Sequence, residues 1–438
     1  MLATGGLYAP TIRYHNDTFY VICTNCKRGD SYEKDGQDKS ENFVVSCSDI
    51  WSNEWSDPVY FEFDGIDPSL FFEDGKAYVH ASAAPGPWTK INLFEIDLST
   101  GEKLSPEKTI WEGTGGVWRE GPHIYKKDGW YYLMIAEGGT HENHMVVMSR
   151  SRDIWGPYEA CPNNPILTAR GTNEYVQYTG HCDAFQDEQG QWWGVCLAVR
   201  KDTKGRYNMG RETFITHGTW NGDWLSFDTV KIVPEDLAPP STGIAVLTAA
   251  PSADLIYIRD PEIGRYSIID SGAEVALTAS LNDFTNPRLS PTFIGKRQRK
   301  LKGRSSATLR GSSVSQSAKF KAGIACYKDE HRFLRIFYDV STSIVTSELR
   351  NNAKQIYKTE SREVQGADSH ITFRISYTEA EYRLEYTTQQ DPDLPFTTMQ
   401  VIDTLDMTGP DFVGPVIGVF AVAEAGEPVV DFAGFSVE

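Results

Sequence analysis

A short hairpin pattern that recurs four times is the feature of this sequence that most limits its fold. Each copy has a short strand, a turn rich in Asp, Asn or Gly, and an aromatic-rich strand. The copies are APTIRYHNDTFYVICTN from Ala9, DPSLFFEDGKAYVHASA from Asp67, EGPHIYKKDGWYYLMIAEG from Glu120 and GHCDAFQDEQGQWWGVCLAV from Gly180. Their turns fall at Asn16-Asp17, Asp74-Gly75, Asp128-Gly129 and Gln189-Gly190. Such residues favour tight β-hairpin turns, so the pattern predicts an all-β chain.

The spacing of the copies predicts how these hairpins are arranged. The second residue of each copy lies at Pro10, Pro68, Gly121 and His181, so the copies are 53 to 60 residues apart. This is the length of a four-stranded blade with its loops, which predicts a β-propeller. A β-sandwich with unrelated hairpins is the alternative, and four regular recurrences disfavour it.

The pattern stops near Trp220, and a proline-containing segment leads to short alternating strands. Examples are HRFLRIFYDV from His331, HITFRISY from His370 and GPVIGVFAVAEAG from Gly414. These strands predict a β-sandwich of jelly-roll type. The predicted domains are an incomplete β-propeller of about four blades over residues 1–235, a linker over 236–265 and a jelly-roll β-sandwich over 266–438.

The composition of the chain disfavours two classes of binding partner, nucleic acids and membranes. The formal net charge is −18 and no basic stripe runs along the chain, which disfavours a nucleic-acid partner. No apolar run approaches the roughly 18 residues of a membrane span, so no membrane partner is expected. The N-terminus shows no signal peptide, which is compatible with a cytoplasmic protein or with a secreted one whose N-terminus is lost.

The seven cysteines are scattered along the chain. Cys23 and Cys26 form a lone CxxC without a second pair or a His at zinc spacing, so a zinc site is not expected. The odd count in a long chain predicts free structural thiols rather than a disulfide framework.

Two of the four copies begin with a carboxylate, Asp67 before Pro68 and Glu120 before Gly121. The innermost strand of a propeller blade lines the central channel, so residues that open equivalent strands converge on one pocket. Two acids among aromatic residues suit glycoside hydrolysis, in which one carboxyl group protonates the leaving oxygen. The alternative is that both acids belong to turns or edge strands.

The residues around these acids resemble glycoside hydrolase family 43, and within it the β-xylosidases and α-L-arabinofuranosidases with a C-terminal concanavalin-like sandwich. The matching propeller runs are GGLYAPTIRY from Gly5, GIDPSLFFEDGKAYV from Gly65, REGPHIYKKDGWYYLMIAEGGT from Arg119, GHCDAFQDEQGQWW from Gly180 and GRET from Gly210. PTFIGKRQ from Pro291 and KAGIACYKDEHRFLRIFYD from Lys321 resemble the family's appended sandwich. The resemblance implies a five-bladed propeller that hydrolyses xylan-derived β-xylosides or α-L-arabinofuranosides with inversion. It leaves open whether xylose or arabinose is preferred.

The resemblance also implies roles for individual residues. Glu120 matches the general acid, and Asp67 matches the carboxylate that raises the pKa of the acid and orients it. Arg211 matches the arginine that reaches the bound sugar; an exposed strand arginine is the alternative.

Three further residues of the predicted pocket have weaker assignments. His181 matches a histidine near the propeller axis, where family members hold a hydrated cation such as Ca²⁺ through water; the alternative is a buried, hydrogen-bonded histidine. No cofactor is required for the chemistry. Tyr8 and Trp118 are candidate walls of the sugar pocket, and packing roles are equally compatible with their sequence context.

One element of the family pattern is missing. The family carries a third carboxylate, the general base, in an Asp-Pro-Ser-type motif of its first blade. This chain opens at a segment that resembles the second blade, and Asp67-Pro68-Ser69 lies in a context that matches the third. We therefore expect hydrolysis by this chain to be impaired through loss of the base.

Three explanations for the missing base remain open. A segment is absent from the sequence, or the protein is a non-catalytic carbohydrate-binding relative, or a homo-oligomer supplies the base from a partner chain. A sandwich that acts as an independent binding module is a further, less favoured interpretation.

Overall fold

The computed structural model describes most of the chain. The described residues are 5–27, 29, 38–52, 54–83, 86–234, 237, 245–246, 255–269, 274–313, 319–364, 370–389, 395–409 and 412–438.

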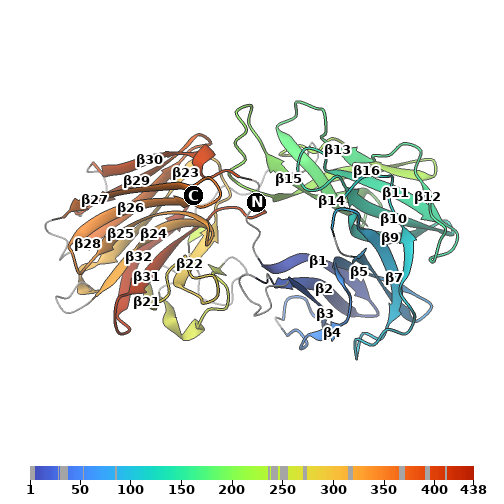
Figure 1. The fold of residues 1–438 in the computed structure, drawn as a ribbon, viewed down its shortest axis with the longest axis horizontal. Coiled ribbons are helices and arrows are strands. Elements are labelled where there is room, and N and C mark those ends of the chain that lie inside the picture. Colours follow the sequence, from blue (N-terminus) through green and yellow to red (C-terminus); the bar gives the residue numbers. More distant parts are fainter. Residues whose placement is uncertain are drawn as a thin grey trace. The chain divides into compact units, whose positions relative to one another are not determined.

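The first half of the chain forms four antiparallel sheets, one for each hairpin copy (Figure 1). The first sheet has the order β1 (Gly6–His15), β2 (Thr18–Lys27), β3 (Lys39–Cys47) and β4 (Val59–Phe61). The second has β5 (Gly65–Glu73), β6 (Lys76–Ala83), β7 (Lys90–Ile96) and β8 (Lys108–Trp111). The third has β9 (Glu120–Lys127), β10 (Trp130–Glu137), β11 (Met145–Ser151) and β12 (Glu159–Ala160), with β13 (Leu167–Thr168) also paired to β11. The fourth has β14 (Val176–Gln186), β15 (Trp192–Arg200), β16 (Glu212–Asn221) and β17 (Trp224–Phe227).

The turn chemistry explains why each sheet starts with a hairpin. Asn16-Asp17, Asp74-Gly75 and Asp128-Gly129 all have positive φ values, between 48° and 75°, and each pair joins its two strands directly. Two consecutive left-handed residues are what a tight hairpin turn with the natural strand twist requires. The fourth turn is longer, since the Asp187 amide donates to the Gln191 carbonyl across it. The predicted turns are thus confirmed, with a wider loop around Gly190.

Apolar cores lie between successive sheets. The first and second sheets share a cluster around Ile22, Leu70 and Phe94, all fully buried or nearly so. Similar clusters join the second sheet to the third and the third to the fourth. The inner strands β1, β5, β9 and β14 contact one another in that order. This is a propeller arrangement of four sheets, as the number of repeats predicted.

The second half of the chain forms a sandwich of two antiparallel sheets. One has the order β20 (Tyr266–Ile269), β21 (Glu274–Thr278), β32 (Val429–Val437), β23 (Gly303–Arg310), β28 (His370–Tyr377), β29 (Glu381–Thr387) and β30 (Thr397–Asp403), with β18 (Ala245–Val246) paired to β32. The other has β19 (Ile256–Tyr257), β22 (Thr292–Arg297), β31 (Val416–Ala423), β24 (Phe320–Asp329), β25 (Arg332–Asp339), β26 (Ile344–Asn351) and β27 (Ile356–Glu363). Within the described residues, short 3₁₀ helices are η1 (Ile263–Arg265), η3 (Gly311–Ser313) and η4 (Thr404–Asp406).

Alternating residues from both sheets fill the sandwich core, which includes Phe320, Phe373 and Phe432. The strands predicted from His331, His370 and Gly414 correspond to β25, β28 and β31. The predicted linker, 236–265, differs from the structure where it is described. It supplies β18 and β19, whose backbones pair with β32 and β22, and it contains η1. Backbone pairing with strands of the two sheets places these short segments in the sandwich.

The chain forms two compact units whose boundary differs from the predicted one. One unit comprises residues 4–199 and 212–238, and the other comprises residues 200–211 and 239–438. The loop between β15 and β16 therefore belongs to the unit that contains the sandwich. Sequence order alone would have placed this loop in the propeller.

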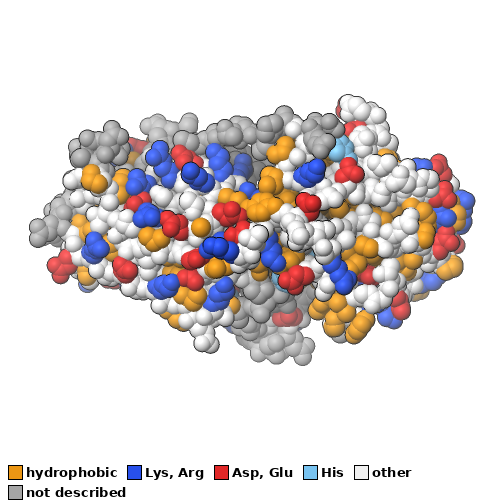
Figure 2. Space-filling view, turned by 90° about the horizontal axis from the view of Figure 1, so that it is seen from above, with side chains coloured by type: hydrophobic (Ala, Val, Ile, Leu, Met, Phe, Trp, Pro, Cys, Tyr) orange, Lys and Arg blue, Asp and Glu red, His pale blue; other side chains and the backbone are white. Residues whose placement is uncertain are grey.

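All seven cysteines are buried thiols that form no disulfide bond, which confirms the prediction of structural thiols. Burial raises the pKa of the Cys23 thiol to about 11. On the face seen in Figure 2, basic and acidic side chains of the described residues are interspersed. Within the described part of the chain, no helix has the length and apolar character needed to cross a membrane.

Candidate active site

A β-bulge interrupts the inner strand of the first three sheets at the same place. Pairing shifts register between Tyr8 and Thr11 in β1, between Ile66 and Ser69 in β5, and on β10 between the partners of Glu120 and His123 in β9. The residues at the bulges have left-handed backbones, namely Ala9 (φ 41°), Asp67 (φ 54°) and Gly121 (φ 54°). His181 in β14 has the same conformation, with φ 46°. Bulges of this kind re-aim side chains and are common next to active sites.

The bulges correct the predicted equivalence of the two acids. Asp67 occupies the bulge position of its strand, whereas Glu120 lies one residue before the bulge at Gly121. Their side chains therefore do not leave equivalent points of equivalent strands. The repeat pattern treats Pro68 and Gly121 as equivalent, whereas the bulges make Asp67 equivalent to Gly121. The offset is therefore one residue.

Asp67 links the second, third and fourth sheets at this point. Its side chain is buried, and its Oδ2 accepts the amide of Gly121 at 3.1 Å. The Nδ1 atom of His181 lies 3.9 Å from the same oxygen. The His181 ring also covers Gly121 so closely that a Cβ there would lie 2.7 Å from Nε2. Gly121 thus has two requirements that favour glycine, a left-handed backbone and a close neighbour.

Glu120 lies directly before this cluster, as the first residue of β9, and is partly exposed. The Asp67 carboxylate binds the amide that follows Glu120, so the two acids are joined through one peptide unit. A partly exposed carboxyl group at the start of an inner strand can exchange a proton with a ligand, which a fully buried one cannot do directly.

Trp118 stands two residues before Glu120 with a left-handed backbone (φ 56°) and 39% of its surface exposed. Its amide donates to the Pro87 carbonyl at 2.7 Å. The neighbouring Trp88 is 62% exposed, and the Arg119 guanidinium lies 5.4 Å from its ring centre. Sequence reasoning missed Trp88. Exposed tryptophan rings such as these suit the apolar faces of a sugar.

A buried glutamate stabilises the loop that leads to Trp118. Glu137 is 1% exposed, and its carboxylate accepts hydrogen bonds from the amide and the hydroxyl of Thr114 at 2.5 and 2.7 Å. The Gly138 amide donates to the Val117 carbonyl at 2.8 Å. Tyr8, the remaining predicted pocket wall, is half-buried in β1, and its carbonyl accepts the Cys23 thiol.

Further along the inner strands, a polar network joins all four sheets. Arg13 in β1 donates to both carboxylate oxygens of Asp183 in β14, at 2.6 and 3.1 Å. Its Nη2 lies 3.0 Å from Nδ1 of His123 in β9 and 3.3 Å from the hydroxyl of Ser69 in β5. The Tyr125 hydroxyl donates to Asp183 at 2.7 Å. Each of these residues lies in a hairpin copy, but none was predicted as a site residue from the sequence.

Burial and charge set the protonation states in this network. Burial would raise the pKa of Asp183, but His123 and the Arg13 guanidinium outweigh it and hold the pKa at about 2. Burial lowers the pKa of His123 to about 3. His80, fully buried in β6, also has its pKa lowered well below its usual value by burial. At neutral pH the network therefore contains an ionised pair and uncharged imidazoles.

Arg211 belongs to a different unit from the other predicted site residues. It belongs to the unit that contains the sandwich, at the end of the β15–β16 loop, and its guanidinium lies 4.3 Å from the Phe412 ring centre. The structure thus groups Tyr8, Asp67, Trp118, Glu120 and His181 in the propeller unit, and Arg211 with the sandwich.

Among the residues that the structure describes, no three His, Cys, Asp or Glu side chains are placed to hold a metal ion directly. A cation bound through water would need few protein ligands. The predicted hydrated cation near His181 therefore stays a prediction.

Comparison with known sequences identifies the family. The profile of Glycosyl hydrolases family 43 matches residues 2–225. The profile of the β-xylosidase C-terminal concanavalin A-like domain matches residues 250–438. The chain belongs to glycosyl hydrolases family 43. Both profiles together cover the propeller and the sandwich, in the order that the sequence predicted.

Curated members of the family are similar to this chain over part of their length. A non-reducing end α-L-arabinofuranosidase of Bacteroides ovatus is 36% identical over 309 residues, which cover 68% of this chain and 56% of that protein. A xylosidase/arabinosidase of Butyrivibrio fibrisolvens is 40% identical over 235 residues, which cover 50% of this chain and 43% of that protein. The chain thus spans about half the length of the curated relatives that it matches.

Solved structures of the family share the fold over nearly the whole chain. The family 43 protein from the xyloglucan locus of Bacteroides ovatus matches 98% of this chain and 85% of its own, with a TM-score of 0.82 and 29% identity. A xylan β-1,4-xylosidase of Bacillus halodurans has a TM-score of 0.85 over 99% of this chain and 87% of its own, at 24% identity. The second match supports the fold alone.

Proposed function

We propose that this family 43 chain binds xylan-derived β-xylosides or α-L-arabinofuranosides and presents Glu120 as the proton donor. The observation that carries the proposal is the hydrogen bond from the Gly121 amide to Asp67, which links the buried carboxylate to the residue after Glu120. The exposed Trp118 lies two residues before the acid, and the ring of the exposed Trp88 lies against the Arg119 guanidinium. The names of the curated relatives support this substrate class.

In the proposed reaction, the Glu120 carboxyl group gives its proton to the glycosidic oxygen as the bond to the anomeric carbon breaks. Inverting hydrolysis also needs a carboxylate on the opposite side of the sugar, about 6.5 to 9.5 Å from the acid, to deprotonate the attacking water. We propose that Glu120 and Asp67 form the acid half of such a site. We also propose that Arg211 reaches the sugar and that a hydrated cation such as Ca²⁺ binds near His181 through water.

The finer proposal is that this chain by itself hydrolyses its substrate poorly, because the base is missing. The alternative is a carbohydrate-binding protein without turnover. Assays with aryl β-xylosides and aryl α-L-arabinofuranosides measure hydrolysis, and calorimetry with xylotriose and arabinotriose measures binding. Binding without turnover would support loss of the base, and a partner chain that restores turnover would support assembly of the site from two subunits.

The assignment of the acid has its own test. Glu120→Gln keeps the shape of the side chain and removes its proton, so any hydrolysis should fall by at least 100-fold. Glu188→Gln, an exposed residue of the β14–β15 loop, is the matched control and should leave the rate unchanged. Equal rates for Glu120→Gln and the wild type would show that another group donates the proton.

A further inference from the structure

The β15–β16 loop has its own internal framework, built on Asp202. Its Oδ1 accepts the amides of Lys204 and Arg206 at 2.9 and 2.8 Å, and the Gly205 amide donates to the Asp202 carbonyl at 3.0 Å. Burial would raise the pKa of Asp202, but these amide hydrogen bonds outweigh it and lower the pKa. Asp202 Oδ2 also lies 3.4 Å from Nη1 of Arg206. These contacts within the loop therefore help to orient the Arg206 side chain independently of its contacts with the sandwich.

Arg206 then binds the sandwich at η4. Its Nη2 donates to both carboxylate oxygens of Asp403 at 3.0 Å, and its Nε donates to the Thr404 hydroxyl at 3.1 Å. Only 7% of Arg206 is exposed. Hydrogen bonds between two charged groups are stronger than those between neutral groups. The guanidinium thus connects the turn of Asp202 to a single point of the sandwich.

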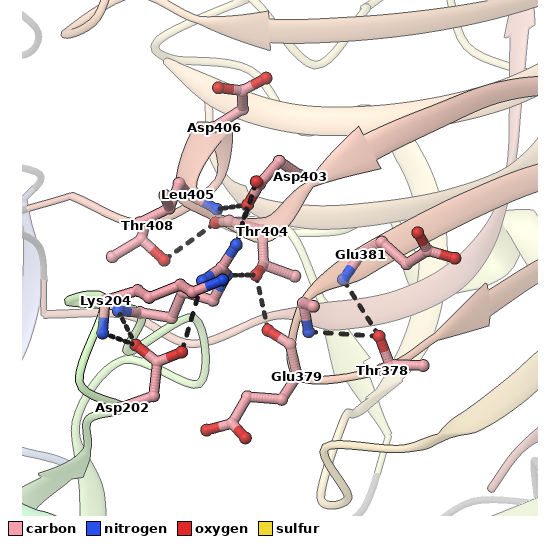
Figure 3. Close-up of polar contacts among 12 residues, drawn as sticks. Asp202, Lys204, Thr378, Glu379, Glu381, Asp403, Thr404, Leu405, Asp406 and Thr408 are labelled. Carbon is pink, nitrogen blue, oxygen red and sulfur yellow. Dashed lines mark hydrogen bonds and ion pairs between the residues drawn. The ribbon is translucent and has the colours of Figure 1, made fainter.

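The receiving site is itself well held, as Figure 3 shows around Thr404 and Asp403. The Thr404 hydroxyl donates to the Glu379 carbonyl at 2.6 Å, and the Thr404 amide donates to the Ala380 carbonyl at 2.9 Å. Asp403 caps η4 by accepting the Leu405 amide at 2.9 Å. Thr404 is fully buried. Arg206 therefore binds to a rigid corner where η4 meets the β28–β29 turn.

Three more hydrogen bonds hold the segment between Arg206 and Arg211, one through the Asn208 side chain and two through backbone carbonyls. The Asn208 amide group donates to the Tyr382 hydroxyl, and Lys328 Nζ donates to the Asn208 carbonyl at 2.9 Å. Arg297 Nη2 donates to the Met209 carbonyl at 2.5 Å.

Gly210 is the last residue of this loop before Arg211. It has a φ of 65°, and a Cβ there would lie 2.3 Å from the Val413 carbonyl oxygen. The close approach and the left-handed backbone both require glycine. The loop is therefore held up to the residue that precedes Arg211.

We propose that Arg206 is a positioning residue for Arg211, and that the sandwich serves sugar binding by holding the β15–β16 loop through Asp403 and Thr404. This inference rests on the proposed function, in which Arg211 reaches the sugar. The Arg206 guanidinium itself contacts Asp202 in the loop and donates hydrogen bonds to Asp403 and Thr404 in the sandwich. Its substitution acts on the ligand only through the placement of Arg211.

The test compares two readouts in Arg206→Met, Asp403→Asn and the conservative Arg206→Lys. Calorimetry with xylotriose and arabinotriose should show Kd weakened about tenfold in Arg206→Met and partly restored in Arg206→Lys, because small displacements of a positioned group reduce binding strongly. Hydrogen exchange should become at least tenfold faster at the amides of residues 207–212, while exchange in β24 stays unchanged. Lys358→Met, which breaks the exposed ion pair with Asp406 on the same η4 turn, is the control and should change neither readout.

The two hypotheses fail differently. If the wild type binds neither trisaccharide, the proposed function is overturned and the role of Arg206 in sugar binding is overturned with it. If the wild type binds and Arg211→Ala loses affinity, but Arg206→Met and Asp403→Asn keep the wild-type Kd, only the positioning role is wrong. Unchanged exchange at 207–212 in Arg206→Met would overturn the holding of the loop, whatever the sugar result.

Discussion

Mild acid should destabilise the propeller through two buried histidines. His123 Nδ1 lies 3.0 Å from Arg13 Nη2, and His80 Nε2 accepts the amide of Ile124 at 3.2 Å. In each neutral ring the acceptor nitrogen is the one that a second proton must occupy, so protonation breaks a buried hydrogen bond. Burial lowers the pKa of His123 to about 3 and that of His80 well below its usual value.

The size of the effect follows from proton linkage. An unfolded histidine has a pKa of about 6.5, so below that pH the unfolded chain takes up protons that the folded propeller does not. Both folded pKa values are depressed, so the stability is fully present above about pH 6.5 and is lost as the pH falls toward the folded values. Acidification from pH 7 to pH 5 should lower the free energy of unfolding by about 2 kcal/mol for each histidine, or about 4 kcal/mol for the two together.

Tryptophan fluorescence makes this measurable for the propeller alone. All eleven tryptophans lie between residues 51 and 224, so their emission reports the propeller unit and not the sandwich. Urea unfolding at pH 7 and pH 5 gives the free energy of unfolding at each pH. We expect a decrease of about 4 kcal/mol on acidification, a large share of typical domain stability.

His123→Gln provides the decisive comparison. Its amide oxygen can accept from Arg13 and cannot be protonated in this range, so the variant should lose about 2 kcal/mol less than the wild type between pH 7 and pH 5. His15→Gln, whose ring stacks on Phe72 outside this network, is the control and should keep the pH dependence of the wild type. If His123→Gln loses as much stability as the wild type, the reasoning about the buried imidazole is refuted.

Other substitutions test the site and the network around it. Gly121→Ala should weaken trisaccharide binding at least tenfold in calorimetry, because its Cβ meets the His181 ring and its backbone is left-handed; unchanged Kd would show that this contact does not shape the pocket. Arg13→Met should lower the free energy of urea unfolding by about 2 kcal/mol, which is less than for a fully buried ion pair because both side chains are partly exposed. The same substitution should raise the pKa of Asp183 above about 2. An unaltered urea midpoint would mean that this ion pair does not stabilise the propeller. Glu137→Gln should cost about 1 to 3 kcal/mol in the same assay, because an amide N–H replaces one acceptor of a buried pair of hydrogen bonds; a wild-type midpoint would argue against that role.

Much of the architecture was predictable because its signals are local. A turn such as Asp128-Gly129 needs only two residues with left-handed backbones, and strand alternation in β25 or β28 spans eight residues. The acids Asp67 and Glu120 were found in the same way, because each opens a hairpin copy. The offset of one residue between them was not predictable, since a bulge depends on pairing with the neighbouring strand rather than on the residues of the strand itself.

By itself, the sequence determined the four hairpin copies, the sandwich strands and the acids at the starts of two inner strands. Only the tertiary structure brought Arg13 to Asp183, 170 residues further along the chain, and attached the β15–β16 loop to the sandwich through Arg206 and Asp403. Contacts between distant segments leave no periodic or compositional mark in a single sequence, because they depend on which elements come to share a surface. Asp67 illustrates both contributions. The sequence predicted it as a site carboxylate, but its hydrogen bond to the Gly121 amide forms only when two sheets pack together.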